Sequence, residues 1–325
     1  MTLIVNNLSK KYDDNWVIKD VSLEVERGEI LGLFGIVAEG KTTIIRVLAG
    51  ELPLNGGAIF YNSEDLTNRH CDERNFNYPK LTNDAFWKSL FPESQKSSQL
   101  ADGEGQVLAL EHALQNASDV LLLDNQFCFM DRITRERNCE KLRQIVKEKN
   151  LACVFATNDY NEIFSICDRV AVLHNGVIQQ TGTPREVFEQ PNSAAVARIT
   201  GRNNLIEARR LTSSESEMPE FQTVVGNHHV FTDKIEKEQP GAVSENVTLT
   251  IRPEHVSISF GASFPEDNLL RAEITGISFL GATTLIKLNA NGLILEALVL
   301  RLVGLNVGEE CMVGLPPDRI LVLKD

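Results

Sequence analysis

The chain lacks any hydrophobic run that could cross a membrane. None of its apolar stretches approaches the roughly 20 residues that a transmembrane helix needs. Residues 1–6 also lack the basic start of a secretory signal peptide. Together these two absences predict a cytoplasmic location.

Basic residues and paired cysteines are also scarce. The 32 Lys and Arg residues face 45 Asp and Glu residues, a net charge of −13 at pH 7, which argues against sequence-independent binding to nucleic acid. The 6 cysteines include no C-x-x-C pair, so buried thiols are expected rather than disulfides or a zinc site. His228 and His229 are adjacent, but without further ligands nearby they indicate a turn more than a metal site.

The length of 325 residues and the 42% hydrophobic content are sufficient for two domains. Residues 1–200 alternate apolar strands with helical segments, which predicts an α/β domain. Residues 201–325 contain short strands separated by turns, which predicts a small β barrel or sandwich. The main expected helices are 42–48, 107–114 and 134–150, and the expected strands of the second domain are 247–251, 256–260, 270–277, 284–288, 293–299 and 320–323.

A phosphate-binding motif lies near the start of the first domain. Residues 35–42, Gly-Ile-Val-Ala-Glu-Gly-Lys-Thr, match the G-x-x-x-x-G-K-[ST] pattern between an apolar strand and a helix. In such a loop the backbone N–H groups curl around phosphates, Lys41 reaches the β and γ phosphates, and Thr42 offers its hydroxyl to Mg²⁺. This position favours a nucleotide site over a chance glycine-rich turn.

Two residues inside the motif depart from its usual composition. Ala38 stands where these loops often carry a glycine. Glu39 places a carboxylate beside the phosphate cradle. This side chain either points into solvent or lowers nucleotide affinity.

One carboxylate follows the buried strand predicted at residues 120–123. Asp124 closes this strand, where an acidic side chain has little reason to be unless it meets a cation. We therefore predict that Asp124 coordinates Mg²⁺ through water; the alternative is an aspartate that caps a turn. The next residue is an amide, Asn125.

Several segments in a fixed order resemble ATP-binding subunits of ATP-binding-cassette (ABC) importers that end in a TOBE barrel. They are residues 8–12, 21–23, 28–33, 35–43, 120–124, 167–173, 182–184, 251–254 and 279–281. The resemblance covers nearly the whole chain. It implies an α/β P-loop NTPase domain of the ABC type with a shortened helical subdomain, followed by a small all-β OB-like TOBE barrel. It also implies ATP and Mg²⁺ as cofactors.

The resemblance gives roles to matching positions. Tyr12 matches the aromatic residue that stacks on adenine, with an ordinary half-buried turn tyrosine as the alternative. The residues implied in nucleotide binding are Tyr12, Gly35, Ile36, Val37, Ala38, Glu39, Gly40, Lys41, Thr42 and Thr43, and those implied in Mg²⁺ binding are Thr42 and Asp124.

The chain departs from the family where the chemistry is carried. The catalytic Glu, a general base, falls at Asn125, and the switch His falls at Asn158. The family's Leu-Ser-Gly-Gly-Gln signature aligns with residues 100–104, Leu-Ala-Asp-Gly-Glu. Asp102 and Glu104 there would repel the γ-phosphate unless they rotate into solvent. These losses predict slow or absent hydrolysis.

The resemblance also implies partners. We expect a homodimer, or a heterodimer with another ABC ATPase subunit, bound to a transmembrane permease at the inner face of the cell membrane. The short stretch 41–100 reduces the subdomain that docks on that permease in the family. Two functions stay open, an importer motor subunit and a catalytically dead module with a regulatory or scaffolding role. For residues 201–325 the alternatives are a dimer-stabilising barrel and a ligand sensor.

Overall fold

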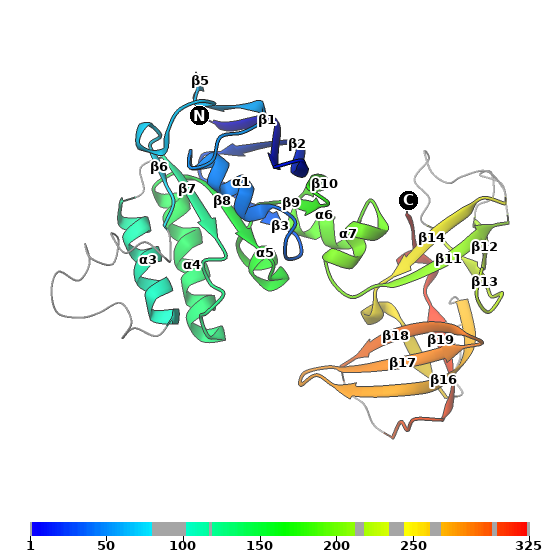
Figure 1. Cartoon of the computed structure of the whole chain (residues 1–325). Coiled ribbons are helices and arrows are strands. Elements are labelled where there is room, and N and C mark those ends of the chain that lie inside the picture. Colours follow the sequence, from blue (N-terminus) through cyan, green and yellow to red (C-terminus); the bar gives the residue numbers. More distant parts are fainter. Residues whose placement is uncertain are drawn as a thin grey trace. The chain divides into compact units, whose positions relative to one another are not determined.

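The computed structural model describes residues 2–79, 102–116, 119–211, 218–233, 244–260, 268–300 and 304–323. The chain folds into two compact units, Met1–Glu189 and Gln190–Asp325 (Figure 1). The short helix α7, Ala194–Ile199, groups with the second unit. Residues 80–101 lie outside the described residues, and with them much of the predicted helical subdomain and the first two signature positions, Leu100 and Ala101.

Two sheets form the first unit. An antiparallel sheet has the order β2-β1-β4-β5, and a mixed sheet has the order β10-β9-β3-β8-β7-β6. In the mixed sheet, β6, β7, β8, β3 and β9 run parallel and β10 pairs antiparallel with β9. The strands are β1 Thr2–Tyr12, β2 Asn15–Glu26, β3 Ile30–Phe34, β4 Gly56–Tyr61, β5 Glu64–Asp65, β6 Phe76–Asn77, β7 Val120–Asp124, β8 Ala152–Thr157, β9 Arg169–His174 and β10 Val177–Gly182.

The helices of this unit are α1 Lys41–Leu48, α3 Asp102–Asn116, α4 Arg132–Glu148, α5 Tyr160–Ile166 and α6 Pro184–Glu189. None of the helices in the described ranges is long and apolar enough to cross a bilayer. Helix α4 begins at an N-cap, Asp131, whose side chain accepts from the N–H groups of Ile133 and Thr134. It then buries Cys139, Leu142 and Val146 at helical spacing.

The mixed sheet is covered on both faces (Figure 1). On one face, α1 and the antiparallel sheet share a core with alternate residues of β3, β7 and β8. On the other face, Ile163 of α5 and the following Cys167 approach Gly32 of β3 so closely that a Cβ there would clash. Because both faces are buried, β3 and β8 are apolar along nearly their whole length, as parallel strands in α/β proteins are.

The second unit contains two antiparallel five-stranded sheets, with the orders β13-β12-β11-β14-β20 and β15-β19-β16-β17-β18. Buried side chains of both sheets form one core that includes Phe221, Leu249, Ile274, Leu288 and Val313. The unit is therefore all-β. Its strands are β11 Asn204–Arg210, β12 Glu220–Thr223, β13 His229–Phe231, β14 Asn246–Ile251, β15 Ser257–Ser259, β16 Asn268–Phe279, β17 Thr284–Ala290, β18 Leu293–Val299, β19 Glu310–Leu315 and β20 Leu321–Leu323.

The strands expected at 247–251, 256–260, 270–277, 284–288, 293–299 and 320–323 are confirmed within a few residues. The strands β11, β12, β13 and β19 were not predicted. Strand β19 reads Glu-Cys-Met-Val-Gly-Leu, in which a glycine and a short apolar run hide the period-two pattern. It nevertheless pairs with both β15 and β16, which shows that tertiary pairing rather than local pattern fixes it.

Arg74 joins α1 to the turn that precedes β6. Its buried guanidinium donates to the carbonyl oxygens of Val47 (2.9 Å) and Leu48 (2.6 Å) at the end of α1, and to that of Leu66 (2.8 Å). Carbonyl groups at a helix C-terminus have no partner inside the helix. Arg74 therefore gives the Leu48 carbonyl a charged donor and adds a second donor to the carbonyls of Val47 and Leu66, which also accept from the backbone N–H groups of Gly50 and Arg69.

We expect Arg74→Met to lower the free energy of unfolding of the first unit by about 3 kcal/mol, because several buried carbonyl groups lose a charged donor. The matched control is Arg69→Ala, which removes an exposed ion pair with Glu64 and is expected to cost less than about 1 kcal/mol. Urea unfolding of both variants gives the comparison. Equal losses in the two would contradict the anchoring role of Arg74.

Candidate nucleotide-binding site

The loop 35–40 connects β3 to α1 at the carboxyl end of the parallel strands. Gly40 is the N-cap of α1, with φ at 102°, and a Cβ at this position would clash with Ile18 of β2. A Cβ on Gly35 would lie 2.5 Å from the carbonyl oxygen of Leu173 in β9. Both motif glycines are therefore required by close packing of the loop against neighbouring strands.

Lys41 folds back over this loop. Its Nζ donates to the carbonyl oxygens of Gly35 and Ile36, both at 2.7 Å, and the side chain is buried. Burial lowers the pKa of Lys41, while the nearby carboxylates of Asp124 and Glu39 act in the opposite direction. An ammonium held at the inner edge of a loop of free N–H groups is placed to meet an anion entering the loop.

Thr42 and Asp124 meet beside this lysine. The Thr42 side chain lies close enough to the Asp124 carboxylate to act on its pKa. Burial raises the pKa of Asp124, whereas the neighbouring Thr42 hydroxyl and the Lys41 charge lower it. A hydroxyl and a carboxylate are hard oxygen donors of the kind that Mg²⁺ takes. The two residues predicted to bind the metal are thus neighbours in space, and they fit that ion.

Glu39 does not point into solvent, so that alternative is wrong. It is only 8% exposed. Its Oε1 lies 2.9 Å from His174 Nδ1, and its Oε2 accepts from the backbone N–H of Asn175, both in the turn between β9 and β10. The carboxylate is therefore held by the β9–β10 turn, although its charge still acts on Lys41.

The remaining loop residues are exposed or strained. The side chains of Ile36 and Val37 are 53% and 75% exposed. They therefore point away from the loop, and the inner side of the loop is lined by backbone. Ala38, at the position where glycine was expected, has φ at 69°, in the left-handed region. A non-glycine residue there costs about 1 kcal/mol. Thr43 follows as the third residue of α1.

Tyr12 lies at the end of β1, with its ring exposed and facing Lys10 Nζ at 5.6 Å. Sequence reasoning missed a second aromatic side chain in the same hairpin, Trp16, whose ring faces Lys11 Nζ at 5.7 Å. Val17 is next in β2, and it lies against Gly40 of the loop. The hairpin end that carries both exposed rings therefore adjoins the loop.

Asn125 immediately follows Asp124 in a left-handed conformation, with φ at 47°. Its N–H donates to the carbonyl oxygen of Ala156, and its Nδ2 lies 3.5 Å from Asp124 Oδ1. Its Oδ1 is buried and finds no hydrogen-bond partner within the described part of the chain. The amide therefore turns its donor side toward Asp124, and its assignment to the position of the family's general base stays a prediction.

Asn158 is exposed, one residue beyond the end of β8. Because Phe34 pairs with Thr157 and Asp124 with Ala156, the loop, Asp124 and Asn158 share one edge of the mixed sheet. The predicted signature positions Asp102 and Glu104 begin α3, and their predicted repulsion of phosphate stays a prediction.

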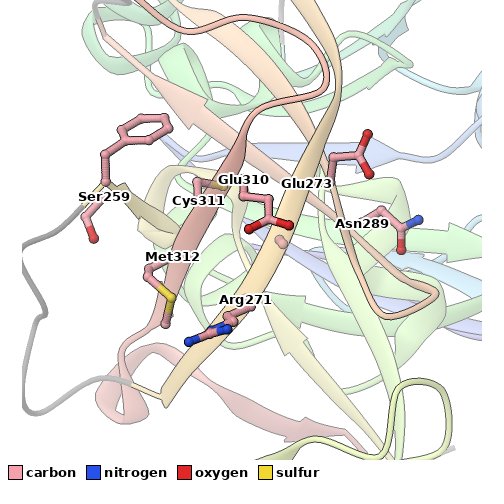
Figure 2. Close-up of a pocket in the computed structure, with 9 residues that line it drawn as sticks. Ser259, Arg271, Glu273, Asn289, Glu310, Cys311 and Met312 are labelled. Carbon is pink, nitrogen blue, oxygen red and sulfur yellow. The ribbon is translucent and has the colours of Figure 1, made fainter.

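The second unit has a separate pocket of about 410 Å³. Figure 2 shows its labelled side chains projecting from β15, β16, β17 and β19. Its lining combines the polar side chains of Ser259, Arg271, Glu273, Asn289 and Glu310 with Phe260, Ala272, Cys311 and Met312. The ligand-sensing role considered for this region stays a prediction. His228 follows the turn 224–227, and its Nε2 donates to the carbonyl oxygen of Ala290 at 2.9 Å, whereas His229 begins β13.

Comparison with known proteins supports both halves of the architecture. A model of the ABC transporter family matches residues 18–90, and a model of the TOBE domain matches residues 249–323. The spermidine/putrescine import ATP-binding protein PotA of Acetivibrio thermocellus is 29% identical over 310 residues, covering 85% of this chain and 84% of that protein. The molybdate/tungstate import ATP-binding protein WtpC of Pyrococcus horikoshii is 28% identical over 358 residues, covering 98% and 99%.

A solved structure, a nucleotide-free ATP-binding cassette from an ABC transporter, has the same fold with a TM-score of 0.50 and 17% identity, over 56% of this chain and 92% of that one. The two domain matches and the relatives together agree with the order of elements and with the phosphate loop. The chain therefore contains an ABC transporter domain match and a C-terminal TOBE domain match, and along most of its length it is similar to import ATP-binding proteins.

Proposed function

We propose that residues 35–43 and Asp124 bind Mg-ATP, and that the chain serves as the ATP-binding subunit of an ABC importer. The observation that carries the proposal is the arrangement of Lys41, bonded across the loop carbonyls, beside the Thr42–Asp124 pair. In this arrangement Lys41 would exchange its carbonyl acceptors for phosphate oxygens, and the oxygens of Thr42 and Asp124 would hold Mg²⁺. Tyr12 or Trp16 offers a ring for the base.

The importer assignment rests on the relatives. Both are import ATP-binding proteins, and this chain spans most of their length. Their names give a polyamine cargo for one and an oxyanion cargo for the other, at nearly equal identity to this chain. The likeness therefore supports import but does not choose the solute. As an importer subunit, the chain would work as a dimer bound to a permease at the inner face of the membrane.

We further propose that hydrolysis is slow. In the family the residue at position 125 accepts a proton from the attacking water, and an amide cannot do so at neutral pH. Asn158 likewise lacks the imidazole expected at the γ-phosphate. An amide can orient water, but Asn125 Oδ1 is buried and without a partner among the described residues, so the side chain would have to move before Oδ1 could contact a water. The alternative, a dead module that senses ATP or acts as a scaffold, predicts binding with no turnover at all.

Lys41→Ala is expected to weaken ATP binding at least roughly tenfold, because a buried cation that meets the phosphates is lost. Lys141→Ala is the matched control, since it removes the same charge from a partly exposed ion pair with Glu111 on the same unit. Equilibrium titration of the full chain with ATP and Mg²⁺ gives both affinities. Equal affinity of the Lys41→Ala variant and the wild type would remove the nucleotide-site proposal.

Asp124→Asn is expected to abolish the dependence of ATP affinity on Mg²⁺, with Asp318→Asn in the second unit as control. The same dependence in the wild type should fade as pH falls. Because burial raises the pKa of Asp124, its carboxylate is protonated at a higher pH than an exposed aspartate, and the protonated form does not bind Mg²⁺. Titrations with and without Mg²⁺ across pH test this. An unchanged Mg²⁺ effect in Asp124→Asn would place the ion elsewhere.

Steady-state ATP turnover of the wild type is expected to stay well below about 1 s⁻¹, the lower end of ordinary enzyme rates. Asn125→Glu alone should not restore turnover to that rate, because Asn158 and the signature remain altered. Asn125→Gln is the control for a longer side chain that cannot act as a base. Lys41→Ala gives the background turnover of a protein with an impaired nucleotide site. Wild-type turnover at or above that rate refutes the slow-hydrolysis proposal, and full activity in Asn125→Glu refutes a role for the signature.

A further inference from the structure

Three adjacent side chains of different metal-binding types meet in the turn before β6. His70 is the N-cap of the 3₁₀ helix η1, Cys71–Glu73, and Cys71 and Asp72 are its first two residues. The imidazole, the thiol and the carboxylate each have a ligand atom within 4.8 Å of the others. We propose that His70, Cys71 and Asp72 form a binding site for one zinc-class divalent cation, separate from the nucleotide site.

The ligand atoms of these three groups lie close enough together to share one ion. His70 Nδ1 lies 3.3 Å from Cys71 Sγ and 3.2 Å from Asp72 Oδ2, and Cys71 Sγ lies 3.7 Å from Asp72 Oδ1. Zinc bonds of about 2.0–2.3 Å to nitrogen, oxygen and sulfur separate neighbouring ligand atoms by roughly 3.3–3.7 Å. Because Cys71 Sγ also lies 3.8 Å from His70 Nε2, beside the ring, the side chains must rotate to place one nitrogen, one sulfur and one oxygen around a zinc ion.

The fold holds this turn in place before any ion binds. Glu73 Oε2 accepts from the backbone N–H of His70 at 3.0 Å, so Glu73 closes the turn and is not needed as a ligand. The next residue, Arg74, is bonded to the end of α1. The turn also packs so tightly on Gly50, just beyond α1, that a Cβ there would lie 2.8 Å from the backbone nitrogen of Cys71. A preformed turn lowers the entropy that metal binding must overcome.

The ligand set selects the kind of ion. Sulfur and imidazole nitrogen suit Zn²⁺, whereas Mg²⁺ and Ca²⁺ take oxygen ligands. The His70 and Asp72 side chains are 66% and 87% exposed, so water can occupy the fourth position. The ion displaces the thiol proton of Cys71, which passes to solvent, and the site becomes Zn²⁺ bound to thiolate, imidazole, carboxylate and water. The hydrogen bonds now linking the three groups give way to bonds to the metal.

A second exposed thiol provides an internal control. Among the described cysteines, Cys71 is half-buried and Cys128 is exposed, while Cys139, Cys153, Cys167 and Cys311 are buried. Cys128 lies in the loop after Asn125, where Gln106 Nε2 is 3.1 Å from its sulfur. It does not belong to the His70, Cys71 and Asp72 group. Because a thiolate bound to zinc is shielded from alkylating reagents, the ion should slow the reaction of one thiol and not the other.

The test is alkylation of the full chain by iodoacetamide, read by peptide mass spectrometry, without nucleotide and with either Zn²⁺ or Mg²⁺ added. We expect Zn²⁺ to slow the labelling of Cys71 at least roughly tenfold, with Cys128 unchanged and Mg²⁺ without effect. His70→Ala and Asp72→Asn should each lose most of the protection, and each removes an exposed side chain, so the fold should be kept.

Three results overturn the site. These are an unchanged labelling rate of Cys71 with Zn²⁺, equal protection of Cys71 and Cys128, and protection that persists in both His70→Ala and Asp72→Asn. In any of these cases the three groups serve only as hydrogen-bond partners in the turn. The outcome does not depend on ATP binding, because the assay contains no nucleotide and Lys41→Ala should respond to Zn²⁺ as the wild type does.

Discussion

The bond from the Lys41 ammonium to the carbonyl oxygens of Gly35 and Ile36 is the contact on which the candidate site depends. It ties the first turn of α1 to the start of the loop, and so fixes the loop as a closed arc of backbone. The arc can close because Gly35 and Gly40 leave no side chain where β9 and β2 press against it. Packing around two glycines and one lysine thus gives a short loop the shape of an anion cradle.

On the proposed function, the charges around Lys41 favour nucleotide binding over nucleotide hydrolysis. The negative charges of Asp124 and Glu39 already act on the Lys41 ammonium and raise its pKa. A glutamate at position 125 would add a third carboxylate near the incoming triphosphate. Asn125 omits that charge and turns its amide nitrogen toward Asp124. On the proposed function, an amide at position 125 both removes the general base and lowers the electrostatic repulsion of the nucleotide, so slow hydrolysis and retained affinity would have one physical cause.

Features of the site that depend on neighbouring residues in the sequence could be predicted, whereas features that depend on distant residues could not. The loop, Lys41, Thr42 and Asp124 are set by a short motif and an apolar strand, and they were assigned without coordinates. The partners of Glu39 lie 135 and 136 residues further along the chain, so its burial could not be predicted from its neighbours. Trp16 was missed because its position beside the loop depends on how β2 packs on Gly40.

Helix α1 connects the two candidate sites. It has only eight residues, Lys41–Leu48, and a helix of that length is not stable alone in water. Its first residue is the lysine of the phosphate loop, and its last carbonyl groups are held by Arg74, next to the turn of His70, Cys71 and Asp72. Contacts at both ends therefore keep the helix in place. A ligand that binds either end in the folded state alone stabilises the same helix by mass action, so the two sites act on one element without touching each other.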